Sequence, residues 1–437
     1  MSIADMFSTF LDNLKVDNAE VISSRYGEIT LSLNKYFRNT DSRIDNSLQV
    51  GSYGRHTGIK GISDLDMLYI MPNSSWNNYK DGKQYELLKD TRDAILQRYQ
   101  RTNIVVDRLV VCIKYLNFHI EVQPVFEIND EQGERCFKYP DTYNGGSWKI
   151  TKPIHEIQAM KEFVDQKNKN LRKLCKMTRA WKNKHGINMG GLLIDTLAYN
   201  FLKLYSDYDD KSFYYYDWMS RDFFKYLSEE PNKDYYLALG SNQRVKVKKK
   251  FQKKAKEAYD LCLDAIAAEK TDSVNEKWKK IYGHFFPGNK NISFAAESLG
   301  KPSPRNTEEF VENLHPVDIY YNLQIDCEVS QNGFREYSLW DMIKKHIPLL
   351  ANKHLKFYVT ECDVPTPYIL KWKVLNRGPE AERRDMIRGQ IVNDKGSQSC
   401  IEHTSFKGNH IVECYAIRDS VVVARASIDV PIQTNQL

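Results

Sequence analysis

Two aspartates two residues apart carry the clearest chemical signal in the sequence. Asp64 and Asp66 open the apolar run DLDMLYI, and side chains at i and i+2 of a strand lie on one face. Carboxylates held so close repel each other unless a cation lies between them. Mg²⁺ removes that conflict, because it takes oxygen ligands and completes its shell with water and substrate phosphates. The pair therefore predicts a metal site.

A third carboxylate completes this site. Two metal ions roughly 3.5–4 Å apart can activate an attacking hydroxyl and neutralise a leaving pyrophosphate, usually with one more acid on a neighbouring strand. Glu121, in FHIEVQPVF, is the candidate, because it alternates with Ile120 and Val122, which point to the opposite face. Asp107 is the rival, although it lies near the start of its strand.

A Gly-Ser pair precedes the aspartates by eleven residues. A tight turn at Gly51 and Ser52 lets backbone N–H groups approach a phosphate, and the serine hydroxyl adds a donor. Asp64 and Asp66 alone could be exposed acids at a strand end. The turn, the acid pair, the apolar strand and the later Glu121 together favour nucleotidyl transfer.

The composition sets the class of protein. The chain has 437 residues, of which 41% are hydrophobic and 27% charged, so we expect folded domains. No apolar run reaches about 18 residues and no signal peptide is recognisable, so we expect no membrane partner. The eight scattered cysteines indicate reduced thiols and a cytoplasmic protein. The net charge of +6 suits a protein that handles polyphosphates, and leaves nucleic-acid binding open.

Two local clusters allow competing interpretations. Cys400, His403, His410 and Cys414 could bind zinc, but we interpret them as residues of two paired strands. The basic tract 244–256 could contact nucleic acid, or could be a solvated face, which is the commoner outcome.

Hydrophobic periodicity predicts the elements that position the acids. We expect two helices in the first forty residues, split near Asp17, a strand at 64–71, a helix at 85–101, and strands at 103–115 and 117–128. This order predicts a mixed sheet packed on helices. Residues 139–153 are rich in Gly, Asn and Pro and are expected to form a loop. Residues 188–287 are expected to be nearly all helical.

From Pro316 the period changes to two, which predicts strands. Six runs alternate or are β-branched, with one helix at 340–345, and short strands with frequent turns predict a β-sandwich. We therefore expect four parts: a core at 1–160, a helical domain at 161–290, a linker at 291–313 and a β-rich domain at 314–437.

These residues resemble the polymerase β-like nucleotidyltransferases, and more closely the CD-NTases, bacterial relatives of cyclic GMP-AMP synthase. The resemblance covers residues 1–287 and rests on these blocks: QVGSYGRHTGIKGISDLDMLYIM, HIEVQPVF, GGSWKITKPIHEI, LRKLCKMTRAWKNKHG, LALGSNQRVKVKKKFQKKAKEA and WKKIYGHFFP. It implies an α+β fold: a polymerase β-like nucleotidyltransferase core with an oligoadenylate-synthase-like helical domain, followed by the β-sandwich C-terminal domain.

The resemblance also implies roles for single residues. Asp64, Asp66 and Glu121 would be catalytic and would hold two Mg²⁺ ions, or Mn²⁺. The nucleotide-binding residues would be Gly51, Ser52, Arg55, Lys176, Arg179 and Asp195. Arg172, Lys176 and Arg179 share one helix face, so a basic phosphate-binding face is plausible from spacing alone.

Two departures from the family pattern concern substrate choice. The third acid is usually Asp, whereas Glu121 is one methylene longer. The family often has Ser and Glu on the helix that here carries Gly191 and Asp195, so a phosphate-binding hydroxyl is missing and the base-reading acid is shorter.

The C-terminal part resembles the AGS-C sensor domains, on the stretches LKWKVLNRGPEAERRDMIRGQI and HTSFKGNHIVECYAIRDSVVVARASIDVPI. An aromatic residue, two arginines and a histidine beside turn glycines could stack on a base and clamp a phosphate. The candidate ligand-binding residues are Trp372, Arg384, Arg388 and His410. A capping sandwich with surface arginines is the alternative.

The leading hypothesis is an enzyme that condenses NTPs into a cyclic di- or oligonucleotide second messenger and releases pyrophosphate. In the family context this messenger would reach a downstream effector in bacterial antiphage (CBASS) signalling. The alternatives are nucleotidyl transfer to RNA or protein, and a nucleotide sensor without catalysis.

Overall fold

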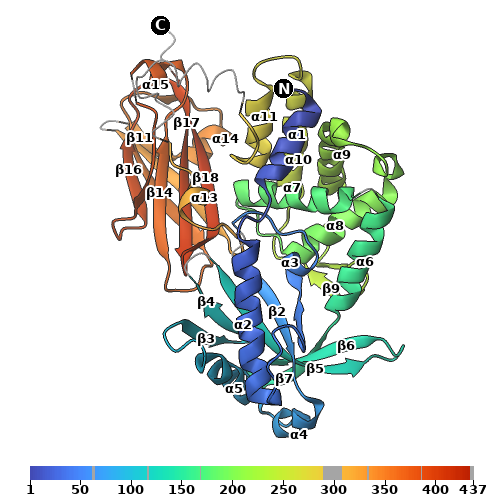
Figure 1. Ribbon diagram of the computed structural model, residues 1–437. Coiled ribbons are helices and arrows are strands. Elements are labelled where there is room, and N and C mark those ends of the chain that lie inside the picture. The colour runs from blue at the N-terminus through green and yellow to red at the C-terminus, as the bar shows by residue number, and fades with distance from the viewer. Residues whose placement is uncertain are drawn as a thin grey trace. The chain divides into compact units, whose positions relative to one another are not determined.

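The computed structural model describes residues 1–61, 64–115, 118–167, 169–288, 308–331, 334–384 and 386–433. The chain divides into two compact units (Figure 1). The N-terminal unit comprises residues 1–180 and 189–287, and the C-terminal unit comprises residues 181–188 and 288–437. Most of the expected linker, residues 291–313, lies outside the described residues, which resume at Glu308.

A mixed sheet forms one end of the N-terminal unit (Figure 1). Its strands are β1 (Ser47–Gln49), β2 (Asp64–Ile70), β3 (Asn103–Asp107), β4 (Val110–Lys114), β5 (His119–Asn129), β6 (Arg135–Asp141) and β7 (Ser147–Thr151). The order is β1-β2-β5-β4-β3, and β6 and β7 extend from β5. Strand β2 runs parallel to β5, and the other pairs are antiparallel. The expected mixed sheet is confirmed.

Two expectations about this sheet were wrong in detail. Residues 103–115 form a hairpin of β3 and β4 that turns at Arg108, not one strand. The expected loop 139–153 is largely the β6–β7 hairpin, in which Tyr139 pairs with Lys149. Its turn contains Asn144 with φ 51° and Gly146 with φ 93°. The Gly and Asn residues that suggested a loop therefore mark only the turn of a hairpin.

Helices α2 (Ala19–Arg38) and α5 (Gln84–Leu96) cover one face of the sheet. Their apolar residues join a core with the strand residues that alternate toward them: Ile29, Leu33, Leu65, Met67, Tyr69, Leu87, Leu88, Ile120 and Val122. Because side chains alternate along a strand, the residues between them face away from these helices. Asp64, Asp66 and Glu121 belong to that second set.

The remaining helices of this unit are α1 (Ile3–Asn13), α6 (Pro153–Gln166), α7 (Asn170–Lys184, of which residues 181–184 are grouped with the C-terminal unit), α8 (Gly191–Leu204), α9 (Tyr216–Glu229), α10 (Gln252–Ala267) and α11 (Val274–Tyr282). Short elements are α3 (Gly51–Gly54) and α4 (Trp76–Tyr79). The nearly helical region 188–287 is interrupted by one hairpin, β8 (Tyr235–Leu237) with β9 (Arg244–Lys246).

The N-terminal helix α1 packs within the helical part rather than on the sheet. The ring of Phe7 lies 5.0 Å from that of Trp278, and the ring of Phe10 lies 4.9 Å from that of Tyr282. Phe7, Phe10 and Trp278 are fully buried. Aromatic contacts of this kind stabilise the helix beyond its buried area, so α1 ties the start of the chain to α11.

The C-terminal unit is a β-sandwich, as expected (Figure 1). One sheet has the order β11-β10-β13-β16 and the other β12-β18-β17-β14-β15. The strands are β10 (Leu323–Gln331), β11 (Phe334–Ser338), β12 (Leu349–Leu350), β13 (His354–Cys362), β14 (Ile369–Leu375), β15 (Arg388–Asn393), β16 (Ser399–His403), β17 (Gly408–Arg418) and β18 (Val421–Gln433). Helices α13 (Val311–Leu314), α14 (Leu339–Lys344) and α15 (Pro379–Arg383) are short.

The cysteines agree with the expected reduced thiols, but not with the expected strand pairing near Cys400 and Cys414. All eight cysteines are free thiols. The interpretation of Cys400, His403, His410 and Cys414 as paired strands was wrong, because β16 pairs with β13 and β17 pairs with β14 and β18. The two halves of the supposed cluster thus belong to different sheets.

Within the described residues, no helix is both long and apolar enough to span a membrane.

Candidate active site

The parallel pairing of β2 with β5 brings the predicted acids together. In the register, Asp66 is opposite Glu121 and Asp64 is opposite His119. All three acids are half-buried and lie on the sheet face that α2 and α5 leave free. Asp107 lies at the end of the outer strand β3, separated from β5 by β4, and its side chain accepts a hydrogen bond from the backbone N–H of Arg108 at 2.6 Å.

Gly51 lies directly against one of these acids. Its φ is +62°, and a Cβ at this position would lie only 1.7 Å from Oδ2 of Asp66. The backbone N–H of Val50 donates to the carbonyl oxygen of Asp66 at 3.0 Å, which fixes this approach. Glycine is thus required twice, by the left-handed backbone and by the space that Asp66 occupies.

Asp64 has a partner that the sequence analysis did not single out. Nε2 of His119 lies 3.0 Å from Oδ1 of Asp64, and both side chains are 13% exposed. His119 precedes Glu121 by two residues, so both share one face of β5. The alternation was visible in the sequence, but the link to Asp64 required the parallel register.

This donor set fits a divalent cation. Asp64, Asp66 and Glu121 supply only carboxylate oxygens, the ligands that Mg²⁺ and Mn²⁺ prefer. The absence of a side chain on Gly51 leaves room for the Asp66 carboxylate itself. A cation held there would neutralise charge on substrate phosphates.

A second acidic group lies elsewhere in the unit. Asp130, Glu134 and His155 offer ligand atoms within 4.8 Å of one another, near the β5–β6 turn. Asp130 pairs with Lys152 at 2.6 Å and accepts two backbone N–H groups of its own turn, and Glu134 contacts His155. These ion pairs and hydrogen bonds indicate that the three side chains stabilise the β5–β6 turn.

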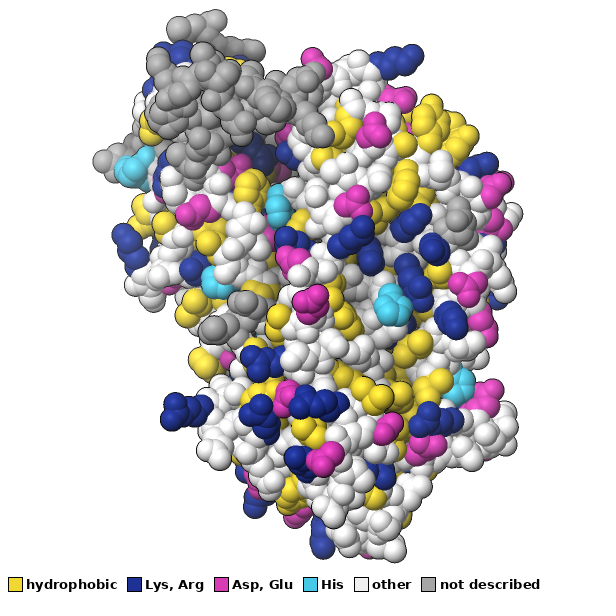
Figure 2. All heavy atoms as spheres, viewed as in Figure 1, with side chains coloured by type: hydrophobic (Ala, Val, Ile, Leu, Met, Phe, Trp, Pro, Cys, Tyr) yellow, Lys and Arg dark blue, Asp and Glu magenta, His cyan; other side chains and the backbone are white. Residues whose placement is uncertain are grey.

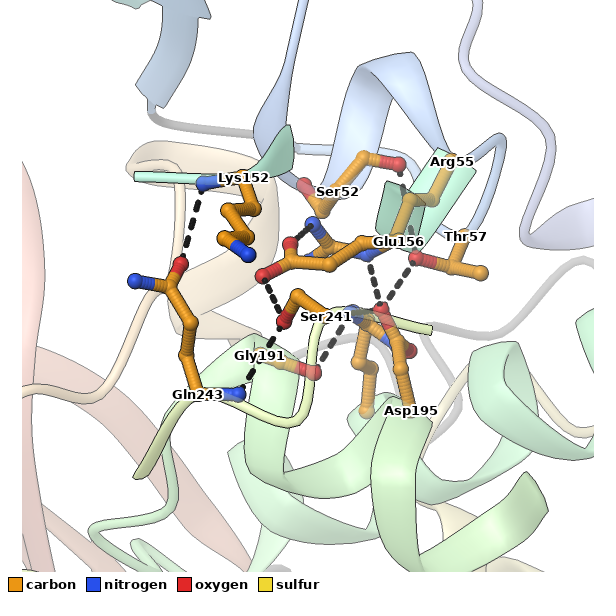
Figure 3. A network of polar contacts seen from close by, with 10 residues as sticks. Ser52, Arg55, Thr57, Lys152, Glu156, Gly191, Asp195, Ser241 and Gln243 are labelled. Atoms are coloured by element: carbon orange, nitrogen blue, oxygen red, sulfur yellow. Dashed lines mark hydrogen bonds and ion pairs between the residues drawn. The ribbon is translucent and has the colours of Figure 1, made fainter. Parts of the chain in front are cut away.

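Arg55, Arg179 and Asp195, which the sequence analysis assigned to the nucleotide, form one buried network, in which Figure 3 labels Arg55 and Asp195. Nε of Arg55 donates to Oδ2 of Asp195 at 2.8 Å, and Arg179 donates to both carboxylate oxygens at 2.6 and 3.0 Å. Asp195 is 0% exposed. Burial opposes its ionisation, but the charges of Arg179 and Arg55 outweigh burial and lower the pKa of Asp195 to about 2.

Three further residues complete this network and were not identified from the sequence (Figure 3). Thr57 donates its hydroxyl to Asp195 at 3.1 Å. Glu156 of α6 pairs with Arg55 at 3.2 Å, and Ser241 donates to Glu156 at 3.1 Å. Burial raises the pKa of Glu156 despite Arg55 nearby. Glu156 stands in the first turn of α6, where acids are common as caps, so its role was not visible in the sequence.

The turn that carries Ser52 is thereby anchored to helices α6 and α8. The carbonyl oxygen of Ser52 accepts the backbone N–H groups of Thr57 and Gly58 at 2.8 and 3.1 Å. Arg55, three residues after Ser52, reaches α6 and α8 through Glu156 and Asp195. The network therefore holds α3 in place next to the carboxylates.

A basic face lies on the first half of α7. Lys176 and Arg172 are half-buried, and Nε of Arg172 donates to the carbonyl oxygen of Arg55 at 3.2 Å. Burial, and then the charges of Arg172, Lys15 and Arg179, lower the pKa of Lys176. Burial, and then the charges of Arg172 and Lys176, lower the pKa of His56. Figure 2 shows Lys and Arg side chains gathered at this level of the unit. Cations crowded in this way favour a polyphosphate.

The basic tract 244–256 is largely solvated. Arg244 lies over the ring of Tyr235 at 4.5 Å. On α10, Lys254 pairs with Glu257 at 2.7 Å and Lys256 with Asp260.

The four ligand candidates of the C-terminal unit do not meet in one place. Trp372 is 1% exposed in the sandwich core and donates Nε1–H to Asp394 at 3.0 Å. Arg388 makes a bidentate pair with Glu402 at 2.6 and 2.8 Å. Arg384 and His410 both contact Phe406, at 5.4 and 5.1 Å from its ring.

His410 is held by the backbone on both sides. Its Nδ1 accepts the N–H of Arg377 at 3.1 Å, and Nε2 lies 3.3 Å from the carbonyl oxygen of Phe406. This network assigns a neutral ring protonated at Nε2. Burial lowers its pKa, which agrees with the neutral form.

Comparison with known families finds a match to part of each unit. Residues 1–163 match the Second Messenger Oligonucleotide or Dinucleotide Synthetase domain. Residues 305–433 match the Adenylyl/Guanylyl and SMODS C-terminal sensor domain.

Individual relatives are distant. The chain is 26% identical over 127 residues to a cytidylate cyclase of Staphylococcus aureus, which covers 29% of this chain and 28% of that protein. The chain thus spans less than a third of this curated relative.

The solved structures that resemble the chain are distant as well. CdnC of E. coli MS115-1 with ATP is 14% identical at a TM-score of 0.45, covering 65% of this chain and 99% of that one. The dinucleotide cyclase of Vibrio cholerae is 12% identical at a TM-score of 0.45, covering 66% and 88%.

The carboxylate site on the mixed sheet lies within the residues that match the synthetase domain. The N-terminal part of the chain thus matches the synthetase-domain family, and its C-terminal part matches the sensor-domain family.

Proposed function

We propose that this protein condenses nucleoside triphosphates into a cyclic di- or oligonucleotide and releases pyrophosphate. The observation that carries the proposal is the parallel register that sets Asp66 beside Glu121, with Gly51 packed on Asp66. The synthetase-domain match and the cyclase named among its relatives support the same class of reaction.

The chain's own residues divide the work. Asp64, Asp66 and Glu121 would hold two Mg²⁺ or Mn²⁺ ions, which supply Lewis-acid stabilisation of charge on the phosphates. Gly51 and Ser52 give the triphosphate close access to backbone N–H groups. Lys176 and Arg172 attract its negative charge. A ribose hydroxyl of one nucleotide then displaces pyrophosphate from the α-phosphate of another.

Asp195 and Arg179 have a different place in this proposal from the one the family pattern gave them. Both are buried and pair with each other, so we assign them to anchoring α8 and α7 beneath the turn at Arg55. The choice of base then depends on groups other than Asp195.

In a cell, the product would act on a downstream effector. By analogy with the CD-NTase class we place this signalling in bacterial antiphage (CBASS) defence, in the cytoplasm, with NTPs as the substrates.

The test is a reaction of the purified protein with labelled ATP, GTP, CTP and UTP, with Mg²⁺ or with Mn²⁺. We expect a low-molecular-weight product that resists phosphatase, identified by mass spectrometry. The matched control is Asp64→Asn with Asp66→Asn, which keeps side-chain size and removes the charges.

Two outcomes would contradict the proposal. Label found only on added RNA or protein would indicate a tailing or modifying enzyme. A double variant that keeps full biological activity, with no product from either protein, would indicate a nucleotide sensor.

A further inference from the structure

The sandwich carries a group of buried charges on the outer face of its five-stranded sheet. Along β14, Trp372 faces the core, so Lys373 points to the other face. Glu413 of β17 is opposite Lys373, and Arg425 of β18 is opposite Tyr415. Lys373 and Arg425 are only 2% and 6% exposed. This face of the sheet points away from the sandwich core, so its side chains would be exposed to solvent unless another segment covered them. Because both cations are buried, another segment must lie over them.

That cover is the strap, residues 308–314, which is the first described stretch after residue 288. Glu308 pairs with Lys373 at 2.7 Å, and Glu312 pairs with Nη1 of Arg425 at 3.1 Å. Val311 between them is fully buried. The strap therefore brings two carboxylates to two cations that belong to the sheet.

The sheet itself supplies fewer negative charges than positive ones at this point. Glu413 contacts both Lys373, at 3.6 Å, and Nη2 of Arg425. The charge of Lys184, in the same compact unit, acts on the same group. Without Glu308 and Glu312, Glu413 alone would face three cations. Such a group attracts another anion, because unpaired buried charge is strongly unfavourable.

The strap lies close against the start of β15. Gly389 has φ +100°, and a Cβ there would lie 3.0 Å from Cα of Glu308. The N–H of Glu309 donates to the carbonyl oxygen of Gly389 at 3.0 Å, and Oε2 of Glu309 accepts the N–H of Ile391 at 2.7 Å.

One donor in this site has no acceptor. Nε of Arg425 is buried and makes no hydrogen bond with any described residue, whereas Nη1 and Nη2 are engaged. Glu312 and Glu413 each accept from one terminal nitrogen of the guanidinium, and neither accepts from Nε. A tetrahedral phosphate offers more oxygens and suits a bidentate contact with such a fork.

We propose that Lys373 and Arg425 form a binding site for a phosphate group of a nucleotide, and that Glu308 and Glu312 of the strap occupy it as an internal ligand. A phosphate that binds there displaces both carboxylates and releases the strap.

This site differs from the one expected at Trp372, Arg384, Arg388 and His410. It also does not depend on the proposed cyclase activity.

The experiment uses the full chain with Asp64→Asn and Asp66→Asn, in EDTA, so that no nucleotide is turned over. Hydrogen exchange of peptides covering residues 308–315 is measured with ATP, with cyclic di-AMP and with inorganic phosphate. Amides of Glu309, Asn313 and His315, which are bonded in the closed strap, should exchange faster with at least one of these probes. The probe that acts at the lowest concentration identifies the source of the phosphate.

Two variants in the same background separate the roles. Glu308→Gln with Glu312→Gln removes the internal ligand, so the probe should bind about tenfold more tightly or better. Glu308→Gln combined with Lys373→Met removes both partners of one ion pair, so no buried charge is left unpaired and the variant should still fold. Because the variant lacks the cation that would bind phosphate, the probes should no longer change the exchange of the strap. Glu402→Gln, in the exposed pair with Arg388, is the control and should change neither.

The proposal is overturned if none of the three probes changes exchange of the strap. It is also overturned if the Glu308/Glu312 variant, with thermal unfolding that shows it folded, binds no more tightly than the Glu402 control.

Discussion

At the scale of single residues, the contact between Gly51 and Asp66 sets the geometry of the carboxylates. A side chain on residue 51 would meet Oδ2 of Asp66 and would need a left-handed backbone. The effect of the collision can be separated from the effect of the left-handed backbone, because Gly61 has a left-handed backbone without a collision. Gly61 has φ +77° and open space where a Cβ would be.

Gly51→Ala should therefore lower turnover by about a hundredfold or more, since shifts near 1 Å at reacting groups have effects of that size. Product formation is measured beside Gly61→Ala, which carries similar backbone strain of about 1–2 kcal/mol without the collision. Equal activity of the two variants would show that the approach to Asp66 is unimportant.

His119 is the second position whose role is set by one contact. Its Nε2 lies 3.0 Å from Asp64, so it orients that carboxylate. His119→Ala should raise the Mg²⁺ concentration needed for half-maximal activity by about 10-fold to 100-fold, the usual effect of losing a partner of a metal ligand. His119→Gln, which can still donate a hydrogen bond, should recover part of this. An unchanged Mg²⁺ titration for His119→Ala would rule out the role.

At the scale of elements, buried ion pairs connect the turn at Arg55 to α6, α7 and α8. Asp195 receives Arg55, Arg179 and Thr57, so its removal leaves two buried arginines without their counter-charge. Asp195→Ala should lower the free energy of unfolding by about 3–5 kcal/mol. Thermal or urea unfolding checks this, with the exposed Asp165→Ala of α6 as control. A normal stability combined with altered base choice would instead indicate contact with the nucleotide.

Helix α9 carries an acid whose burial makes stability depend on pH. Burial raises the pKa of Asp217 to about 6, and the side chain is 5% exposed. The folded pKa lies above the unfolded one, so the penalty is absent below about pH 4 and complete above about pH 6. Asp217→Asn should stabilise the protein at pH 8 by up to about 3 kcal/mol, and hardly at pH 4.

Unfolding at both pH values measures this effect. Glu229→Gln, an exposed acid at the end of the same helix, serves as the control. A gain that is equal at pH 4 and pH 8 would contradict burial as its cause.

At the scale of the whole molecule, the two compact units should respond separately to metal. The acids Asp64, Asp66 and Glu121 all lie in the N-terminal unit. Binding of Mg²⁺ stabilises only what it binds, by mass action. Adding Mg²⁺ should slow hydrogen exchange in peptides from β2 and β5 and leave those from β17 and β18 unchanged. EDTA should reverse the effect and abolish product formation.

The Asp64→Asn, Asp66→Asn protein is the matched control for this measurement, and it should show no protection. Protection that persists in the control would place the metal elsewhere, for example at Asp130 and Glu134. Equal protection in both units would contradict binding confined to Asp64, Asp66 and Glu121.

Local pattern was sufficient for much of this protein. Period-two runs predicted most strands of the sandwich, and helical spacing predicted α1 and α2 with their break near Asp17. The spacing of Gly51, Ser52, Asp64 and Asp66 indicated the chemistry, because all four lie within one short stretch of chain. Such signals depend only on residues that are close in sequence, so a single sequence is enough to identify them.

Only the tertiary structure decided which distant residues meet. The parallel register of β2 with β5 selected Glu121 over Asp107 as the neighbour of Asp66 and revealed His119. Burial turned Arg55, Arg179 and Asp195 into partners of one another, and brought Glu308 and Glu312 to Lys373 and Arg425. Charges separated by many residues in sequence have no fixed distance until the chain packs, so their pairing cannot be determined from spacing alone.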